Sequence, residues 1–243
     1  MKIIKLNATN STNSFLKELA QNQTVENYTV VVTDKQLKGR GQQEAVWFSE
    51  PYKNLTFSVL VSFDNLDVAQ QKYLNFAVSL AILEVLNLKV LKSLRIKWPN
   101  DILSGNQKIS GILIENILKG SKIKSSVIGI GLNVNQVDFS IKLKNVSSLK
   151  LLTDKTFNLD TLLIELVNSL KLYLNRLETK QFDYLEKEYL NCLYKKNTAT
   201  MFKDSNSVLF MGLIRGISID GKLQVELEDE TIKEFGIKEI TFV

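Results

Sequence analysis

Runs of apolar and β-branched residues separated by polar stretches predict a core of strands in the first part of the chain. The buried strands predicted from these runs lie at 28–33, 54–62, 94–98 and 127–135. The turn sequence Ser104-Gly105-Asn106 indicates a hairpin across 102–117. A polar stretch at 34–53 joins the first two strands, which makes it an unusually long loop for the interior of a globular protein.

Helices are predicted where apolar residues recur at helical spacing, at 69–86, 159–177 and 182–194. A shorter helix is expected after Ser11-Thr12-Asn13, because these capping side chains precede Phe15, Leu16 and Leu19.

The pattern changes after Lys196, where short apolar runs alternate with turn sequences such as Asp220-Gly221. Closely spaced short strands are typical of a small β-barrel. The sequence therefore predicts an α+β protein with two domains, at 1–194 and 195–243.

Composition removes several functional classes. The chain has 243 residues, with 44% apolar and 23% charged side chains, as expected for a globular protein with a full core. It contains no histidine, which excludes Ser-His-Asp and Cys-His catalysis and a histidine-based zinc site. Its single cysteine, Cys192, cannot form an internal disulfide, which indicates a reducing compartment. Since no 18-residue apolar run or signal peptide appears, we expect a cytoplasmic protein without membrane contact.

Positive charge is concentrated in the first part of the chain. Residues 1–150 hold 19 Lys and Arg against 11 Asp and Glu, whereas residues 151–243 hold 12 against 15. This excess attracts anions, although lysines scattered over a solvated surface would give the same count. No dense basic stripe with interleaved aromatic residues appears, so we expect no nucleic-acid partner.

The long loop contains Gly39-Arg40-Gly41, which is a candidate anion-binding segment. Glycine lets backbone amides approach a ligand, and guanidinium forms paired hydrogen bonds with phosphate or carboxylate. Taken alone, the same three residues would fit an ordinary surface turn.

Two strand ends and one strand interior carry further candidates. Lys97-Trp98-Pro99-Asn100-Asp101 ends one predicted strand, and Lys108 begins another in which Gly111 would let a ligand lie flat on the sheet. Gly129-Ile130-Gly131 precedes Asn133, but it lacks the third glycine and the helix of a dinucleotide-binding motif. Each segment also has an ordinary structural interpretation, as a turn or a solvated strand end.

The ordered set of these motifs resembles the biotin protein ligase (biotin–[acetyl-CoA-carboxylase] ligase) family. The resemblance rests on Ser11-Thr12-Asn13, Gln36, Gly39-Arg40-Gly41, Trp47, Asn54, Lys97 to Asp101, Lys108 with Gly111, and Gly129 to Asn133. It implies a mixed sheet flanked by helices, of the class II synthetase-like kind, with a C-terminal SH3-like β-barrel. It also implies an enzyme that uses ATP and Mg²⁺ to form biotinyl-5′-AMP and then biotinylates one lysine of a biotin carboxyl carrier domain.

The resemblance assigns roles to individual residues. The residues implied for biotin binding are Ser11, Thr12, Asn13, Gln36, Arg40, Gly41, Gln42, Lys108 and Gly111. Those implied for ATP or adenylate binding are Arg40, Trp47, Asn100, Lys108 and Asn133. Lys108, Arg40 and Asp101 are implied to be catalytic: Lys108 would neutralise developing charge, and Asp101 would act on the incoming lysine or bind the metal.

The chain departs from the family pattern after Gly41, where Gln42-Gln43-Glu44-Ala45 replaces the usual basic or polar residue and further glycine. We therefore expect this loop to bind the adenylate less tightly than in other family members. The motifs begin at Ser11, so we also expect an enzyme without an N-terminal DNA-binding domain.

Two other functions remain as alternatives, a lipoyl or octanoyl transferase of the same fold and a non-catalytic biotin-binding module. The sequence leaves open whether the protein is a monomer or a homodimer.

Overall fold

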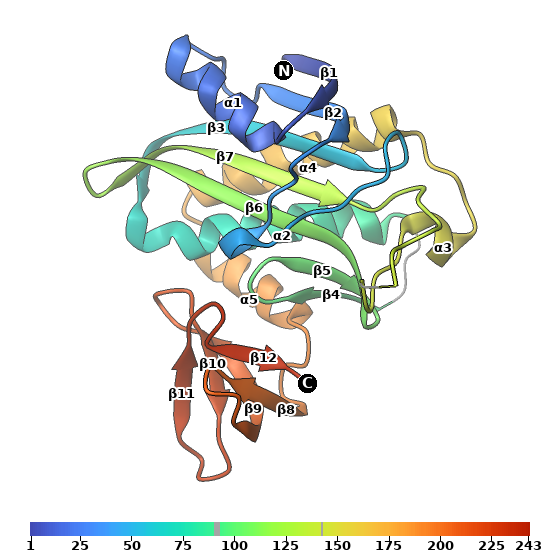
Figure 1. Cartoon of the computed structure of the whole chain (residues 1–243). Helices are drawn as coiled ribbons and strands as arrows, with labels where there is room; N and C mark the ends of the chain where they lie inside the picture. Colours follow the sequence, from blue (N-terminus) through green and yellow to red (C-terminus); the bar gives the residue numbers. More distant parts are fainter. Residues whose placement is uncertain (90–92, 142) are drawn as a thin grey trace.

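A computed structural model describes residues 1–89, 93–141 and 143–243 and arranges them around two β-sheets (Figure 1). The larger sheet has seven strands in the order β1-β2-β3-β7-β6-β5-β4. Their bounds are β1 Ile3–Thr9, β2 Val30–Gln36, β3 Leu55–Asp67, β4 Leu94–Lys97, β5 Asp101–Ser104, β6 Gln107–Lys119 and β7 Lys122–Leu132. Strands β1 and β2 are parallel and the other neighbours are antiparallel, so the sheet is mixed, as expected.

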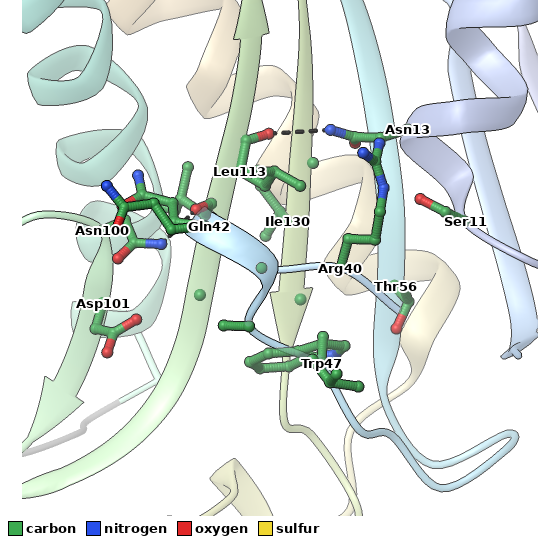
Figure 2. A pocket seen from close by; sticks show the side chains of 18 of the residues that line it. Ser11, Asn13, Arg40, Gln42, Trp47, Thr56, Asn100, Asp101, Leu113 and Ile130 are labelled. Atoms are coloured by element: carbon green, nitrogen blue, oxygen red, sulfur yellow. Dashed lines mark hydrogen bonds between the residues drawn. The ribbon is translucent and has the colours of Figure 1, made fainter. Parts of the chain in front are cut away.

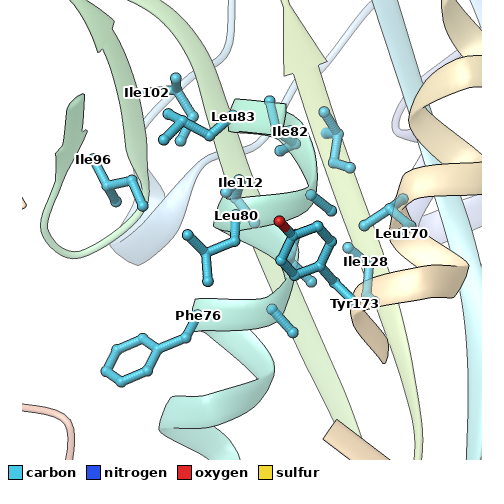
Figure 3. Packing of buried hydrophobic residues seen from close by; sticks show 14 of the residues in the cluster. Phe76, Leu80, Ile82, Leu83, Ile96, Ile102, Ile112, Ile128, Leu170 and Tyr173 are labelled. Carbon is cyan, nitrogen blue, oxygen red and sulfur yellow. The ribbon is translucent and has the colours of Figure 1, made fainter. Parts of the chain in front are cut away.

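Helices cover both faces of this sheet. The α-helices are α1 Thr12–Asn22, α2 Gln71–Asn87, α3 Leu149–Thr153, α4 Leu159–Glu178 and α5 Phe182–Cys192, and the short 3₁₀ turns are η1 Gln42–Glu44 and η2 Val68–Gln70. On one face α2 packs against the central strands and against α4 (Figure 3). The buried side chains at this junction include Leu80, Ile82 and Leu83 of α2, Ile112 and Ile128 of the sheet, and Leu170 and Tyr173 of α4.

Helix α1 lies on the opposite face and covers only part of it (Figure 1). Its buried Leu16 packs with Val31, Leu60 and Val127 in a small second core. The N-terminus of α1 lies beside the end of β2, where the Thr12 N–H donates a hydrogen bond to Gln36 Oε1 (2.9 Å).

A second sheet follows α5 and has five antiparallel strands in the order β11-β10-β9-β8-β12. The strands are β8 Ala199–Asp204, β9 Leu209–Ile217, β10 Leu223–Glu226, β11 Ile232–Phe235 and β12 Ile240–Phe242. This arrangement is consistent with the expected SH3-like barrel. One of its contacts with the rest of the chain is a hydrogen bond from Trp98 Nε1 to the Gly221 carbonyl (3.0 Å).

Most predicted elements are present, with shifted bounds. The strand expected at 127–135 begins at Lys122 and ends at Leu132, and the last helix ends at Cys192 because Leu193 is extended. Strands β1 and β12 and helix α3 had no counterpart in the prediction. The domain boundary at 194/195 stays a prediction, although the second sheet begins close to it, at Ala199. Among the described residues, no helix is long and apolar enough to span a membrane.

Candidate functional site

A cavity of about 260 Å³ lies on the face of the seven-stranded sheet that α1 leaves uncovered (Figure 2). Twelve of the residues singled out in the sequence line it: Ser11, Thr12, Asn13, Gln36, Arg40, Gly41, Gln42, Trp47, Asn100, Asp101, Lys108 and Gly111. These residues come from α1, two loops and three strands, so the fold brings together motifs that are far apart in the chain.

At one end of the cavity, the N-terminus of α1 presents neutral polar groups. Ser11 caps the helix by accepting a hydrogen bond from the Ser14 N–H, and the Thr12 N–H donates to Gln36 Oε1 (2.9 Å). Ser58 Oγ on β3 lies 2.7 Å from Thr12 Oγ1 and 2.6 Å from Asn13 Oδ1. All of these side chains except Gln36 and Ser14 are buried, and they lie at the positive end of the helix dipole. This end suits a neutral ligand that carries both donors and acceptors.

Glycines on β6 and β7 make room for two side chains that lie on the sheet. A Cβ on Gly131 would lie 2.6 Å from Trp47 Cζ2, and one on Gly111 would lie 3.1 Å from Trp47 Cζ3. A Cβ on Gly129 would overlap the carboxamide of Asn13. The glycines therefore let Asn13 and Trp47 approach the backbone of the central strands, as glycines inside strands often do.

Trp47 lines the cavity and lies over Gly111 of β6 and Gly131 of β7; in Figure 2 it is drawn below Arg40 and Gln42. Its Nε1 is buried and has no hydrogen-bond partner within the described part of the chain. A ligand with an acceptor atom at this point would satisfy that donor.

The other end of the cavity carries a lysine and a carboxylate. Lys108 Nζ lies 2.6 Å from Asp101 Oδ1 and 5.6 Å from the centre of the Trp47 ring. The hairpin of β5 and β6 places them together, since Asp101 pairs with Gly111 across the ladder. Both side chains are partly exposed, so the cation remains accessible to an anionic ligand.

The same turn holds Asn100 and Lys97. Asn100 Nδ2 donates to the Ile112 carbonyl (2.7 Å), which fixes the turn to β6. Burial lowers the pKa of Lys97; the charge of Asp101 opposes this effect, and that of Lys108 adds to it.

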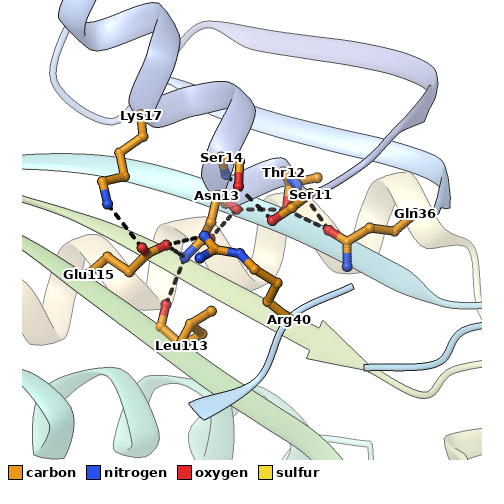
Figure 4. Close-up of polar contacts among 10 residues, drawn as sticks. Ser11, Thr12, Asn13, Ser14, Lys17, Gln36, Arg40, Leu113 and Glu115 are labelled. Carbon is orange, nitrogen blue, oxygen red and sulfur yellow. Dashed lines mark hydrogen bonds and ion pairs between the residues drawn. The ribbon is translucent and has the colours of Figure 1, made fainter. Parts of the chain in front are cut away.

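Arg40 belongs to the segment that folds over the cavity, which we call the lid (residues 37–47). The lid is closed by a bridge between Arg40 and Val46 and includes the turn η1. Arg40 Nη2 lies 2.8 Å from Glu115 Oε2 on β6 (Figure 4). Glu115 was not among the predicted site residues, although it shares a strand face with Gly111 and Leu113 by simple alternation.

The second sheet also reaches the cavity. Ile237 and Lys238, between β11 and β12, line it, and Lys238 Nζ donates to the Gln43 carbonyl of the lid (2.9 Å). No local sequence pattern indicates this contact, because the two residues are 195 positions apart.

Asn133 is the one predicted site residue that does not line the cavity. It is 2% exposed, and its Nδ2 donates to the Ser147 carbonyl (3.0 Å). Strand β7 ends at Leu132, so Asn133 lies beyond the cavity floor and anchors the segment before α3. Its proposed contact with the adenylate stays a prediction.

Asp101 is the carboxylate at the candidate metal position. In the described ranges, no group of three acidic, cysteine or histidine side chains is placed to hold a metal ion. Mg²⁺ usually keeps several waters and is held by one or two carboxylates plus substrate phosphates. A single carboxylate fits a magnesium ion that arrives with a nucleotide. Asp101 is paired with Lys108 in this structure, and its binding of the metal stays a prediction.

Comparison with known proteins adds independent information. Residues 6–133 match the Biotin/lipoate A/B protein ligase family. The chain is 35% identical over 140 residues to the bifunctional ligase/repressor BirA of Bacillus spizizenii. These aligned residues cover 57% of this chain and 42% of that protein. It is 30% identical over 128 residues to a biotin–[acetyl-CoA-carboxylase] ligase of Paracoccus denitrificans, covering 52% of each chain.

Solved structures resemble the whole chain. A biotin protein ligase from Aquifex aeolicus, in complex with biotin and ATP, superimposes with a TM-score of 0.80 at 26% identity and covers 100% of this chain and 98% of that chain. The matched region thus spans about 42% of the length of the first curated relative but nearly all of this structural neighbour. The family match extends over more than half of the chain and contains most of the cavity's lining. The chain belongs to the biotin/lipoate A/B protein ligase family.

Proposed function

We propose that the protein is an ATP-dependent ligase that converts biotin to biotinyl-5′-AMP and transfers biotin to a lysine of a biotin carboxyl carrier domain. The observation that carries this proposal is one cavity with neutral polar groups at one end, Lys108 and Asp101 at the other, and the Trp47 indole in its lining. Biotin has a neutral ureido ring at one end and a carboxylate at the other, so it matches this polarity. The names of the relatives and the biotin and ATP complex of the Aquifex protein support the same substrates.

In the first step, a carboxylate oxygen of biotin attacks the α-phosphorus of ATP and pyrophosphate leaves. Ser11, Thr12, Asn13 and Gln36 would hold the ureido ring, with the helix N-terminus favouring its carbonyl oxygen. Lys108 would lie near the carboxylate and α-phosphate and stabilise the charge that develops between them. Magnesium bound to the nucleotide would screen the remaining phosphate charge.

The lid would cover the acyl phosphate on the side of the cavity opposite the sheet. Gly41 and Gln42 would offer backbone and side-chain groups to the carboxylate, and Arg40 would supply the lid's positive charge. Trp47 and Asn100 would contact the nucleoside, to which the unpaired Nε1 of Trp47 could donate a hydrogen bond. A closed lid would also exclude water, which otherwise hydrolyses an acyl adenylate.

In the second step, the amine of the carrier lysine attacks the acyl carbon, AMP leaves, and the amine loses a proton. Asp101 is the carboxylate nearest to Lys108 in the cavity and would orient this amine or accept its proton. Neither step needs a histidine, which agrees with the composition.

The test combines purified protein, Mg-ATP, biotin and an apo carrier domain, with mass spectrometry of the carrier. The expected result is a mass increase of one biotinyl group that requires ATP. Modification with lipoate in place of biotin would identify a lipoyl transferase instead, and binding without modification would identify a biotin-binding module.

Lys108→Ala is expected to abolish adenylate formation while the protein remains folded. Lys203→Ala is a matched control, because Lys203 is an exposed lysine on β8. Carrier modification by Lys108→Ala at a near wild-type rate would contradict the role assigned to Lys108.

A further inference from the structure

Glu115 connects three parts of the molecule through one carboxylate (Figure 4). Its Oε2 accepts hydrogen bonds from Asn13 Nδ2 (2.9 Å) and Arg40 Nη2 (2.8 Å). Its Oε1 accepts from Lys17 Nζ (3.0 Å). Helix α1, the lid and strand β6 therefore meet at a side chain outside the 260 Å³ cavity.

The carboxylate is ionised in this setting. Burial alone would raise the pKa of Glu115, but hydrogen bonds from Asn13 and Lys17 and the charges of Arg40 and Lys17 lower it below its usual range. The side chain of Glu115 is 18% exposed and that of Arg40 is 46% exposed, so the pair is partly shielded from water on the carboxylate side only.

The pairing leaves most of the arginine available. A guanidinium has five N–H donors, and Glu115 takes one of them through Nη2. The remaining donors are held at the cavity rim, since Arg40 also lines the cavity. A side chain fixed in this way loses less conformational entropy when it binds an anion than one that is free in solution.

Asn13 is fixed by the same carboxylate. Its Nδ2 also donates to the Leu113 carbonyl (3.2 Å), and its Oδ1 lies 2.6 Å from Ser58 Oγ. One oxygen of Glu115 thus binds a residue at the neutral end of the cavity and the only arginine of the lid.

We propose that Glu115 is a positioning residue that holds the lid closed through Arg40 and joins the lid to the Asn13 end of the cavity. Its effect on catalysis rests on the proposed function, whereas its effect on the lid does not. The opposite possibility is that Glu115 competes with the substrate for Arg40. In that case Glu115→Gln should increase the rate of biotin-dependent pyrophosphate exchange instead of lowering it.

The first measurement uses trypsin, because the lid carries cleavage sites after Lys38 and Arg40. Glu115→Gln keeps the shape of the side chain and removes its charge. In the full-length protein without ligands, we expect cleavage after Arg40 to be roughly three- to tenfold faster than in wild type, the range of a partly exposed, charge-assisted pair. Thermal melting of both proteins shows whether global unfolding accounts for the difference.

The second measurement is biotin-dependent exchange of pyrophosphate into ATP. We expect Glu115→Gln to lower kcat/KM by about tenfold. We expect the double variant Glu115→Gln/Arg40→Ala to lose less than the two single losses combined, because part of the effect of Glu115 passes through Arg40. A merely structural role would give additive losses. Glu18→Gln is the matched control, since Glu18 is an exposed acidic residue on α1.

Three results would overturn the proposal: unchanged cleavage after Arg40, faster exchange in Glu115→Gln, or additive losses in the double variant. If wild-type protein shows no exchange at all, the proposed function fails, and the trypsin measurement still decides whether Glu115 holds the lid. If Glu115→Gln does not fold, the Arg40→Ala variant provides the second test: accelerated cleavage after Lys38 supports the proposal, and unchanged cleavage contradicts it.

Discussion

Replacing Gly131 by alanine tests the inference that Trp47 occupies space reserved by strand glycines. The new Cβ would lie 2.6 Å from Cζ2 and 2.7 Å from Nε1 of the indole. The new Cβ would lie closer still to Cε2 of the indole, and ordinary carbon contacts begin near 3.4 Å, so the ring must move by at least about 1.1 Å. Trp47 belongs to the lid and is partly exposed, so it can move without disturbing the core.

The expected cost in stability is therefore at the low end of the overpacking range, about 1 kcal/mol, or roughly 2–4 °C in melting temperature. Loss of the indole from its place should cost more in function, about tenfold or more in the rate of biotin-dependent pyrophosphate exchange. The assay is this exchange rate together with a thermal melt.

Gly216→Ala on β9 is the matched control, because its Cβ would meet only the flexible end of Gln224, at 3.3 Å. Adding Trp47→Ala to Gly131→Ala should restore the melting temperature, since it removes the group that clashes. An exchange rate within twofold of wild type, or no recovery in the double variant, would refute the reasoning.

Three further predictions concern the lid, the Glu115 network and the link between the sheets. Gln42→Arg with Glu44→Gly restores the lid composition usual in the family and should slow dissociation of biotinyl-5′-AMP, measured by ligand release; an unchanged rate contradicts the expected weak grip. The folded-state pKa of Glu115 is below its ordinary value of 4.5, so its contribution to stability is complete at neutral pH and is lost as the pH falls through that folded value. The difference in unfolding free energy between wild type and Glu115→Gln, from urea titrations, should therefore be smaller at pH 4 than at pH 7, and a constant difference argues against the shift. Trp98→Phe removes the hydrogen bond to the Gly221 carbonyl and should cost about 0.5–1.5 kcal/mol in unfolding free energy, whereas Trp47→Phe should have a smaller effect.

Local patterns indicated most of the residues that line the cavity, because these residues lie at places with strong local signals. Ser11 is a helix cap, Gly39 and Gly41 flank an arginine in a long loop, and Asp101 follows a strand end. Each position could be identified within a few residues of sequence, and the resemblance to a family then joined them.

The features that were missed depend on contacts between distant segments. Glu115 and Lys238 contact the lid from other strands and turns, at separations of 75 and 195 residues, and neither has a local signal for such a partner. Strand β1 is partly exposed and pairs in parallel with β2 across α1, so its apolar pattern is weak. Asn133 differs from the other predicted residues because its Nδ2 donates to a backbone carbonyl inside the protein. Its contact with the adenylate therefore stays a prediction.

The hydrogen bond from Lys238 to the Gln43 carbonyl joins the second sheet to a segment that covers the cavity. A ligand that closes the lid would therefore also favour docking of that sheet, and thermodynamic linkage requires the reverse effect to have the same size. Binding should raise the melting temperature of the second sheet together with that of the rest of the chain. Substitutions between β11 and β12 can thus alter affinity for a substrate without changing any residue of the seven-stranded sheet.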